Sequence, residues 1–86
     1  MKLNPNFITQ EIDDTLFLVP IGNEEFRGIV KNNKTAAFII NHLKEETTRE
    51  ALIAAMCETY DAPEETLAKD VDTALNKLRE IGAIVE

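Results

Sequence analysis

The chain has 86 residues, of which 44% are hydrophobic and 29% are charged, and its formal net charge at pH 7 is -7. This length suits one small domain (residues 1–86) with one compact core, and the composition is too apolar for a disordered segment. The excess of acidic residues argues against a nucleic-acid surface, which needs clustered lysine and arginine.

The N-terminal stretch MKLNPNF lacks the apolar core of a secretion signal. No apolar run elsewhere approaches the roughly 20 residues that a membrane span requires. We therefore expect a cytoplasmic protein that makes no contact with a membrane.

Three short strands are predicted in the first part of the chain. Phe7 to Ile12 alternates as in a strand with one drier face, and Asp13 and Asp14 then favour a turn. The apolar run Leu16 to Ile21 suits a strand that is covered on both faces or flanked on both edges. After a second turn, Phe26 to Lys31 forms the third strand. Together they predict an antiparallel meander with the third strand at an edge.

The edge strand has two opposed features. Gly28 has no side chain, so another backbone or a bulky group can approach closely there. Arg27 and Lys31 are charged residues of the kind that protects an exposed edge from aggregation. From these residues alone, a protected edge is the favoured interpretation.

Three helices are expected after the strands. Asn33 is a suitable N-cap for the first helix, and Thr47 and Glu50 have capping-box spacing at the start of the second. The third begins near Pro63, Gly82 is its C-terminal cap, and residues 83–85 pack back onto the core. The apolar stripes that predict the helical core are Ala36, Ile39, Ile40 and Leu43; Leu52, Ile53, Met56, Cys57 and Tyr60; and Leu67, Val71, Ala74, Leu75, Leu78 and Ile81.

No residue pattern predicts catalysis. His42 is the only histidine, and the sequence suggests neither an orienting carboxylate nor further metal ligands near it. Cys57 is the only cysteine, which excludes an intramolecular disulfide, and on an apolar helix face it acts as a small hydrophobe. The 3 glycines are scattered, so no phosphate loop is formed. We expect no catalytic residue, no metal site and no cofactor.

Four segments carry a resemblance to a known family: NPNF, NKTAAFII, TTREALIAAMCETYDAP and KDVDTALNKLREIGAI. In order and spacing they resemble the PqqD family, small proteins named after pyrroloquinoline quinone synthesis and grouped with the leader-peptide-binding domains called RiPP recognition elements. The likeness covers nearly the whole chain. Two positions depart from it: Asn32 replaces the usual leucine, and Glu45 stands where glycine is frequent between the first two helices. These departures leave open whether the pathway is quinone synthesis or another peptide modification.

The resemblance implies an α+β fold related to winged helix-turn-helix domains, with the three-stranded antiparallel meander followed by the three helices. It also implies binding of the leader of a ribosomally synthesised precursor peptide, which adds as a strand to the third strand, beside the third helix. A modifying enzyme, often a radical S-adenosylmethionine (SAM) enzyme, then receives the peptide. The candidate binding residues are Arg27, Gly28, Ile29, Val30 and Lys31 of the strand and Asp70, Val71, Ala74 and Lys77 of the helix.

Two alternatives compete with peptide binding. A winged-helix DNA-binding regulator would need basic side chains at the start of its recognition helix. The corresponding segment here has one basic residue, Lys69, and four acidic residues: Glu64, Glu65, Asp70 and Asp72. A self-associating structural subunit would pair its open edge with a second copy, giving a homodimer in place of a monomer.

Overall fold

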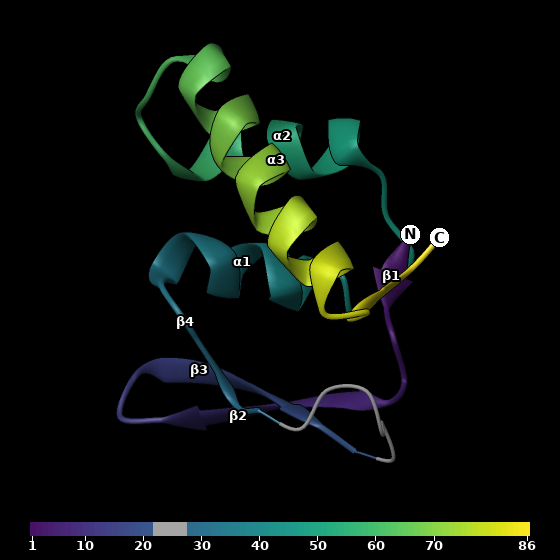
Figure 1. Ribbon diagram of the computed structural model, residues 1–86. Helices are drawn as coiled ribbons and strands as arrows, with labels where there is room; N and C mark the ends of the chain where they lie inside the picture. The colour runs from purple at the N-terminus through teal and green to yellow at the C-terminus, as the bar shows by residue number, and fades with distance from the viewer. Residues whose placement is uncertain (22–27) are drawn as a thin grey trace.

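In a computed structural model of the protein, which describes residues 1–21 and 28–86, a small sheet lies beneath three helices (Figure 1). The sheet contains β2 (Phe7–Ile12), β3 (Thr15–Pro20) and β4 (Val30–Asn32), antiparallel in the order β2-β3-β4. The prediction of a three-stranded meander followed by three helices, an α+β fold, is confirmed.

The turn between β2 and β3 follows from its two aspartates. Asp13 and Asp14 both have positive φ angles, 50° and 65°, which short polar side chains tolerate. This two-residue turn sets Ile12 opposite Thr15 and Phe7 opposite Pro20. Pro20 thus falls at the end of β3, where the loss of a backbone donor costs least.

The third strand differs in its bounds from the prediction of Phe26 to Lys31. Its strand pairing covers only Val30–Asn32, so Gly28 and Ile29 precede β4, and the first two predicted residues, 26 and 27, lie outside the described residues. At the other end the strand continues to Asn32. Its side-chain amide donates to the carbonyls of Leu16 on β3 (3.2 Å) and Val30 (3.1 Å), which fastens this residue to the sheet.

The helices are α1 (Lys34–His42), α2 (Arg49–Thr59) and α3 (Glu64–Glu80). As predicted, the Asn33 side chain caps α1 by accepting a hydrogen bond from the Ala36 N–H (2.8 Å).

The predicted cap of α2 is wrong by one residue. Thr48, not Thr47, is the N-cap, and its hydroxyl accepts from the Ala51 N–H at 3.1 Å. The backbone N–H of Thr47 is instead bonded to the Met1 carbonyl at 2.9 Å, which holds that residue outside the helix. At the end of α3, Gly82 has the positive φ of 74° that favours glycine after a helix.

The core lies between the sheet and the helices, and most of the predicted stripes contribute to it. Cys57 does not contribute, because its side chain is exposed. The face of α2 that is buried consists of Leu52, Ile53 and Met56. The buried residues are Phe7, Leu16, Leu18, Ile39, Ile40, Leu43, Leu52, Ile53, Met56, Leu67, Val71, Leu75, Leu78 and Ala83.

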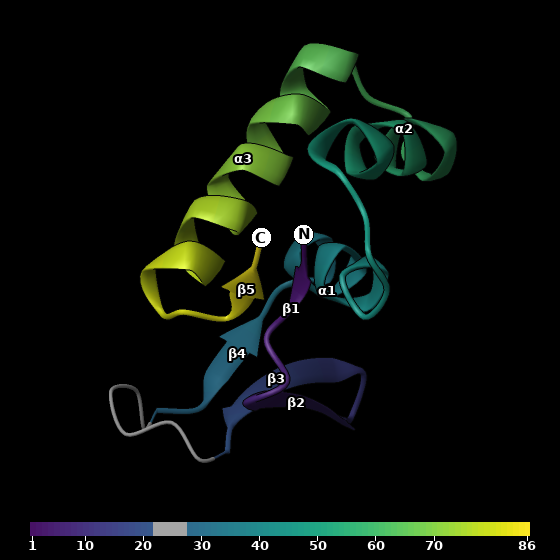
Figure 2. The ribbon, with the colours of Figure 1, turned by 90° about the vertical axis from the view of Figure 1, so that its right-hand side faces the viewer.

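A second, two-stranded sheet joins the two ends of the chain. β1 (Lys2–Leu3) pairs antiparallel with β5 (Ile84–Val85), and the ends lie side by side in both views (Figures 1 and 2). The Asn4 N–H donates to the Ala83 carbonyl at 2.7 Å, and Ala83 itself is fully buried. Residues 83–85 therefore pack back onto the core as expected, and they also form a strand that the sequence analysis did not predict.

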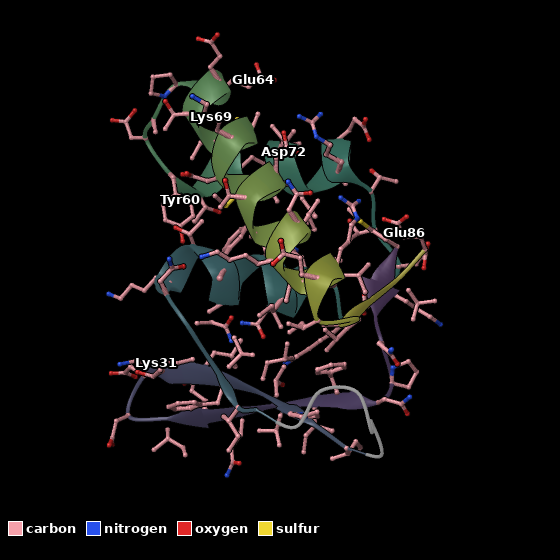
Figure 3. All side chains as sticks on the ribbon, in the orientation of Figure 1. Lys31, Tyr60, Glu64, Lys69, Asp72 and Glu86 are labelled. Carbon is pink, nitrogen blue, oxygen red and sulfur yellow. The ribbon has the colours of Figure 1, made fainter. Side chains whose placement is uncertain are left out.

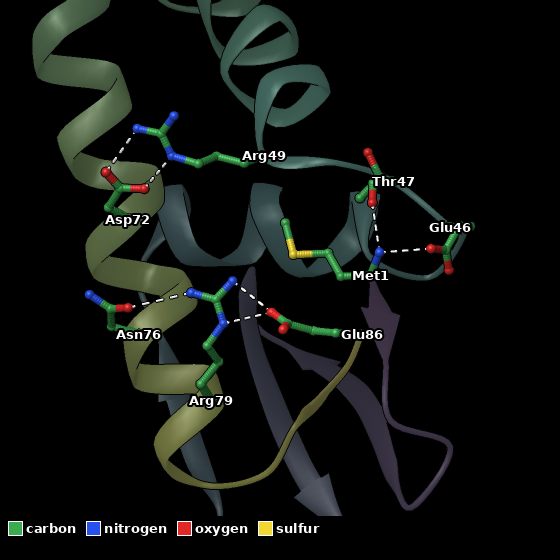
Figure 4. A network of polar contacts seen from close by, with 8 residues as sticks. All are labelled: Met1, Glu46, Thr47, Arg49, Asp72, Asn76, Arg79 and Glu86. Carbon is green, nitrogen blue, oxygen red and sulfur yellow. Dashed lines mark hydrogen bonds and ion pairs between the residues drawn. The ribbon is translucent and has the colours of Figure 1, made fainter.

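Among the described residues, three ion pairs lie on the surface of the helices and the paired chain ends (Figure 4). Arg49 of α2 reaches Asp72 of α3 (Nε–Oδ1 2.6 Å), Arg79 reaches Glu86 (2.7 Å), and the Met1 nitrogen reaches Glu46 (2.7 Å). In the described part of the chain, no helix is both long enough and apolar enough to cross a membrane.

Candidate functional site

A groove of about 350 Å³ lies between β4 and the C-terminal half of α3. Its floor is largely apolar, and charged side chains stand at its rim. A second hollow of about 150 Å³ continues it toward the N-terminal half of α3, past Asp70 and Thr73. The main groove is lined by Val30, Lys31, Asn32, Asn33, Ala36, Ala74, Lys77, Leu78, Glu80 and Ile81.

The helical wall follows from the spacing along α3. Ala74, Leu78 and Ile81 are four and three residues apart, so they share one face of the helix. Leu78 is buried, whereas Ala74 and Ile81 are only partly buried and pack against the core from the groove side. The groove is hollow here because Ala74 and, across from it, Ala36 have the smallest side chains that a helix surface can offer. Space for an additional side chain is therefore built into the helical wall.

The strand wall is an edge of the sheet. β4 pairs with β3 on one side, and among the described residues no strand pairs with its other side. An edge strand carries a row of N–H and C=O groups to which another extended chain can bond. β2 is the other edge, but the groove runs beside β4. The open edge and the hollow therefore occur together at one place.

Alternation along β4 sends its side chains to opposite faces of the sheet. Val30 and Asn32 pair with Leu18 and Leu16, which are buried, so these residues face the helices. Lys31 pairs with the half-buried Phe17, so it alternates with these two residues, and it lies exposed at the mouth of the groove.

The structure brings most of the predicted binding residues together. Val30 and Lys31 line the main groove, as do Ala74 and Lys77, and Asp70 lines its continuation. Gly28 and Ile29 are exposed and directly precede β4.

Two predicted residues are not part of the described groove. Val71 is fully buried in the core, so a molecule in the groove cannot touch its side chain, and the prediction for this residue is wrong. It lies three residues before Ala74, on the core-facing side of the stripe. Arg27 lies outside the described residues.

Several lining residues were missed by the sequence analysis: Asn32, Asn33, Ala36, Thr73, Leu78, Glu80 and Ile81. Leu78 and Ile81 could have been found by extending the spacing from Ala74 by one and two turns. Asn33 was recognised only as a cap, a role that it does have. The position of Ala36 depends on how α1 meets α3, and nothing local indicates it.

The described residues contain no group of three or more histidine, cysteine or acidic side chains arranged to hold a metal ion. His42 is exposed, and the centroid of its ring lies 4.5 Å from that of the Phe38 ring. The pKa of Asp72 is lowered mainly by its hydrogen bond from Arg49, and the pKa of Glu46 is lowered mainly by its bond from the Met1 ammonium; neither residue lines the groove.

The family model described as "Coenzyme PQQ synthesis protein D (PqqD)" matches residues 18–84. The chain belongs to the PqqD family. This confirms the resemblance stated above, and the matched residues include β4 and all of α3, both walls of the groove.

A solved structure has the same fold as this PqqD-family chain. It is described as "TbiB1 in Complex with the TbiA(beta) Leader Peptide", and it aligns with a TM-score of 0.80 over 100% of both chains at 20% sequence identity. A comparison with curated proteins gives no match. At this identity the likeness concerns the arrangement of strands and helices.

Proposed function

We propose that this PqqD-family protein binds the leader of a ribosomally synthesised precursor peptide in the groove between β4 and α3. The leader adds as a further strand to the open edge of β4, and α3 forms the opposite wall. Residues 1–86 act as one peptide-binding domain. The single observation that carries the proposal is that the open strand edge and the partly apolar groove lie side by side.

Strand addition fits this geometry physically. Main-chain hydrogen bonds along an edge supply affinity that depends little on sequence, while alternate side chains enter pockets that set specificity. Here every second side chain of an added strand points toward α3, where Ala36 and Ala74 leave room. The remaining side chains lie on the outer face of the sheet.

The family match and the similar solved structure both support the proposal. The family description refers to coenzyme synthesis, and TbiB1, with the same fold, is described in complex with a leader peptide. Transfer of that ligand class to this chain is our inference.

We further propose that the protein is an adaptor that presents the leader to a modifying enzyme, such as a radical SAM enzyme, and catalyses no reaction itself. Quinone synthesis is one candidate pathway, and peptide modification of another kind is equally compatible with the groove. The cytoplasmic location and the relation to winged helix-turn-helix domains stay predictions. For DNA binding the structure offers no support, because Glu64 and Glu65 occupy the exposed first turn of α3.

The proposal is tested by titrating nitrogen-15-labelled protein with candidate leader peptides. We expect amide shifts concentrated in Val30–Asn32 and in residues 70–81. Ala74→Leu fills the groove and should weaken binding by tenfold or more, because a branched side chain there takes the place of the ligand's. Ala54→Leu, on the exposed face of α2, is the matched control and should bind like the wild type.

Binding that Ala74→Leu leaves unchanged would contradict the groove as the site. The exposed edge of β4 also permits pairing with a second copy, which makes a homodimer the alternative. Light scattering over a concentration series separates the two, since an edge occupied by a second copy gives a dimer and β4 amides that no peptide shifts.

A further inference from the structure

Beside the groove, two exposed residues of the β4 segment differ in their chemistry: Ile29 and Lys31. Lys31, which also lines the groove, pairs with Phe17, and by alternation Ile29, directly before β4, lies two positions earlier on the same side of the strand. Ile29 is 66% exposed, the highest value among the large hydrophobic residues described. An added strand would bring its own outward side chains next to these two residues.

Ile29 stands at the end of an apolar row that crosses the sheet. The β2–β3 register places Ile8 opposite Val19, and the β3–β4 register, continued by one residue, places Val19 beside Ile29. Cross-strand neighbours on one face of a sheet lie close enough to pack. A fourth strand with an apolar side chain at this position extends the row and covers Ile29.

Lys31 stands at the end of the next row, after Gln10 and Phe17, and is the charged member of that row. In a chain with 16 acidic and 9 basic residues, no described residue forms an ion pair with Lys31. Lys31 lines the hollow at the hairpin end of the sheet together with Asp14 and Lys34, and it lines the groove together with Lys77 and Glu80. A carboxylate directly opposite Lys31 in an added strand forms a favourable cross-strand pair, whereas an ammonium there is repelled.

Between these two positions lies Val30, which faces inward. The added side chain opposite Val30 enters the groove toward Ala36 and Ala74, where the floor is apolar. Three consecutive ligand positions therefore meet an exposed isoleucine, an apolar hollow and a lysine.

On the basis of the function proposed above, we infer that the protein selects peptides with an apolar residue anchored in the groove, flanked on one side by a carboxylate and on the other by a second apolar residue. The carboxylate lies opposite Lys31 and the second apolar residue opposite Ile29. In a strand parallel to β4 the order is apolar–apolar–acidic, and in an antiparallel strand it is acidic–apolar–apolar. Lys31 is then a specificity-determining residue and not only a charge that protects the edge.

The test is a selection of randomised peptides by mRNA display on the wild type, Lys31→Glu and Lys69→Glu. The control makes the same charge change at an exposed lysine on the part of α3 outside the groove (Figure 3). We expect wild-type ligands to be enriched in aspartate or glutamate next to two apolar residues. Lys31→Glu should replace the acidic position by lysine or arginine, and Lys69→Glu should leave the pattern unchanged.

One selected peptide then gives the size of the effect. Replacing its acidic residue by glutamine should weaken binding to the wild type by about two- to fivefold, as expected for an exposed cross-strand charge pair, and less at high salt. Lys31→Gln should bind both peptides equally, and its fold is checked by circular dichroism.

The outcomes separate this inference from the function on which it rests. Peptides that compete for the groove but show the same charge pattern on Lys31→Glu would overturn the role of Lys31 and leave peptide binding intact. If the wild type retains no peptide, or Ala74→Leu retains the same peptides equally well, strand addition in the groove is wrong and the inference fails with it.

Discussion

The two walls of the groove are built in different ways. α3 has 17 residues, four of them buried, and an ion pair joins it to α2. β4 has only three residues; within residues 1–21 and 28–86 they pair with β3 alone, and the side chain of Asn32 holds them further. One wall belongs to the core of the protein, and the other is a three-residue strand at the edge of the sheet.

This difference indicates which wall of the groove can move when a ligand binds. A wall that is part of the core cannot move without loss of stability, whereas a short edge strand can shift at small cost. In our proposal α3 defines the shape of the groove, and β4 gains its missing partner only when the ligand arrives. The three predictions that follow test this contrast, in order of decreasing effect.

The largest effect is expected from Leu75→Ala, which leaves a cavity beneath the helical wall. Leu75 is almost fully buried, so we expect a loss of about 2–5 kcal/mol in the free energy of unfolding, measured by urea denaturation. Lys77→Ala, two residues away and exposed, should change stability by less than about 0.5 kcal/mol. Similar losses for both variants would contradict the view of α3 as a core wall with one binding face.

A smaller effect is expected from Asn32→Ala on the strand wall. It removes the side-chain bonds to the Leu16 and Val30 carbonyls and should cost about 1 kcal/mol. Hydrogen exchange should accelerate at the β4 amides and stay unchanged along α3. Asn41→Ala, at an exposed position of α1, is the control. Uniformly faster exchange in both walls would show that they are not independent.

The smallest effect concerns the ion pair between α2 and α3. Arg49 holds the pKa of Asp72 below its ordinary value of 3.8 through a hydrogen bond. A lowered folded-state pKa stabilises the protein above the unfolded pKa, and this stabilisation is lost as the pH falls through the folded pKa. The difference in urea midpoint between wild type and Asp72→Asn should thus be small at neutral pH, begin to decline near pH 3.8, and vanish only once the pH falls below the lowered pKa of the folded state. A difference that grows on acidification would contradict this sign.

Much of the fold could be predicted because its signals are local. Alternation gave β2, paired aspartates gave the turn, and a capping asparagine marked the start of α1. The paired ends were not predicted, since β1 and β5 are two residues each, too short for a periodic pattern, and depend on a partner at the far end of the chain. The exposure of Cys57 was missed because it lies at the border of a buried stripe, where spacing alone does not decide.

The candidate site was predicted less completely than the fold. The edge strand and helix were named from a family resemblance, but which residues of α3 face the groove depends on how far the helix is rotated about its axis. Val71 and Ala74 are three residues apart on one stripe, yet one is buried and the other lines the groove. Only the packing of α1 against α3 settles this, and it lies outside any local pattern.

The pairing of β1 with β5 has a consequence for the order of folding. It joins residues at the greatest separation along the chain, so the entropy of closing the largest loop must be overcome before these bonds form. We therefore expect the Asn4 amide, which is bonded to Ala83, to acquire protection late in refolding, after the amides of α3. Formation of this short ribbon would then mark the completion of the native state.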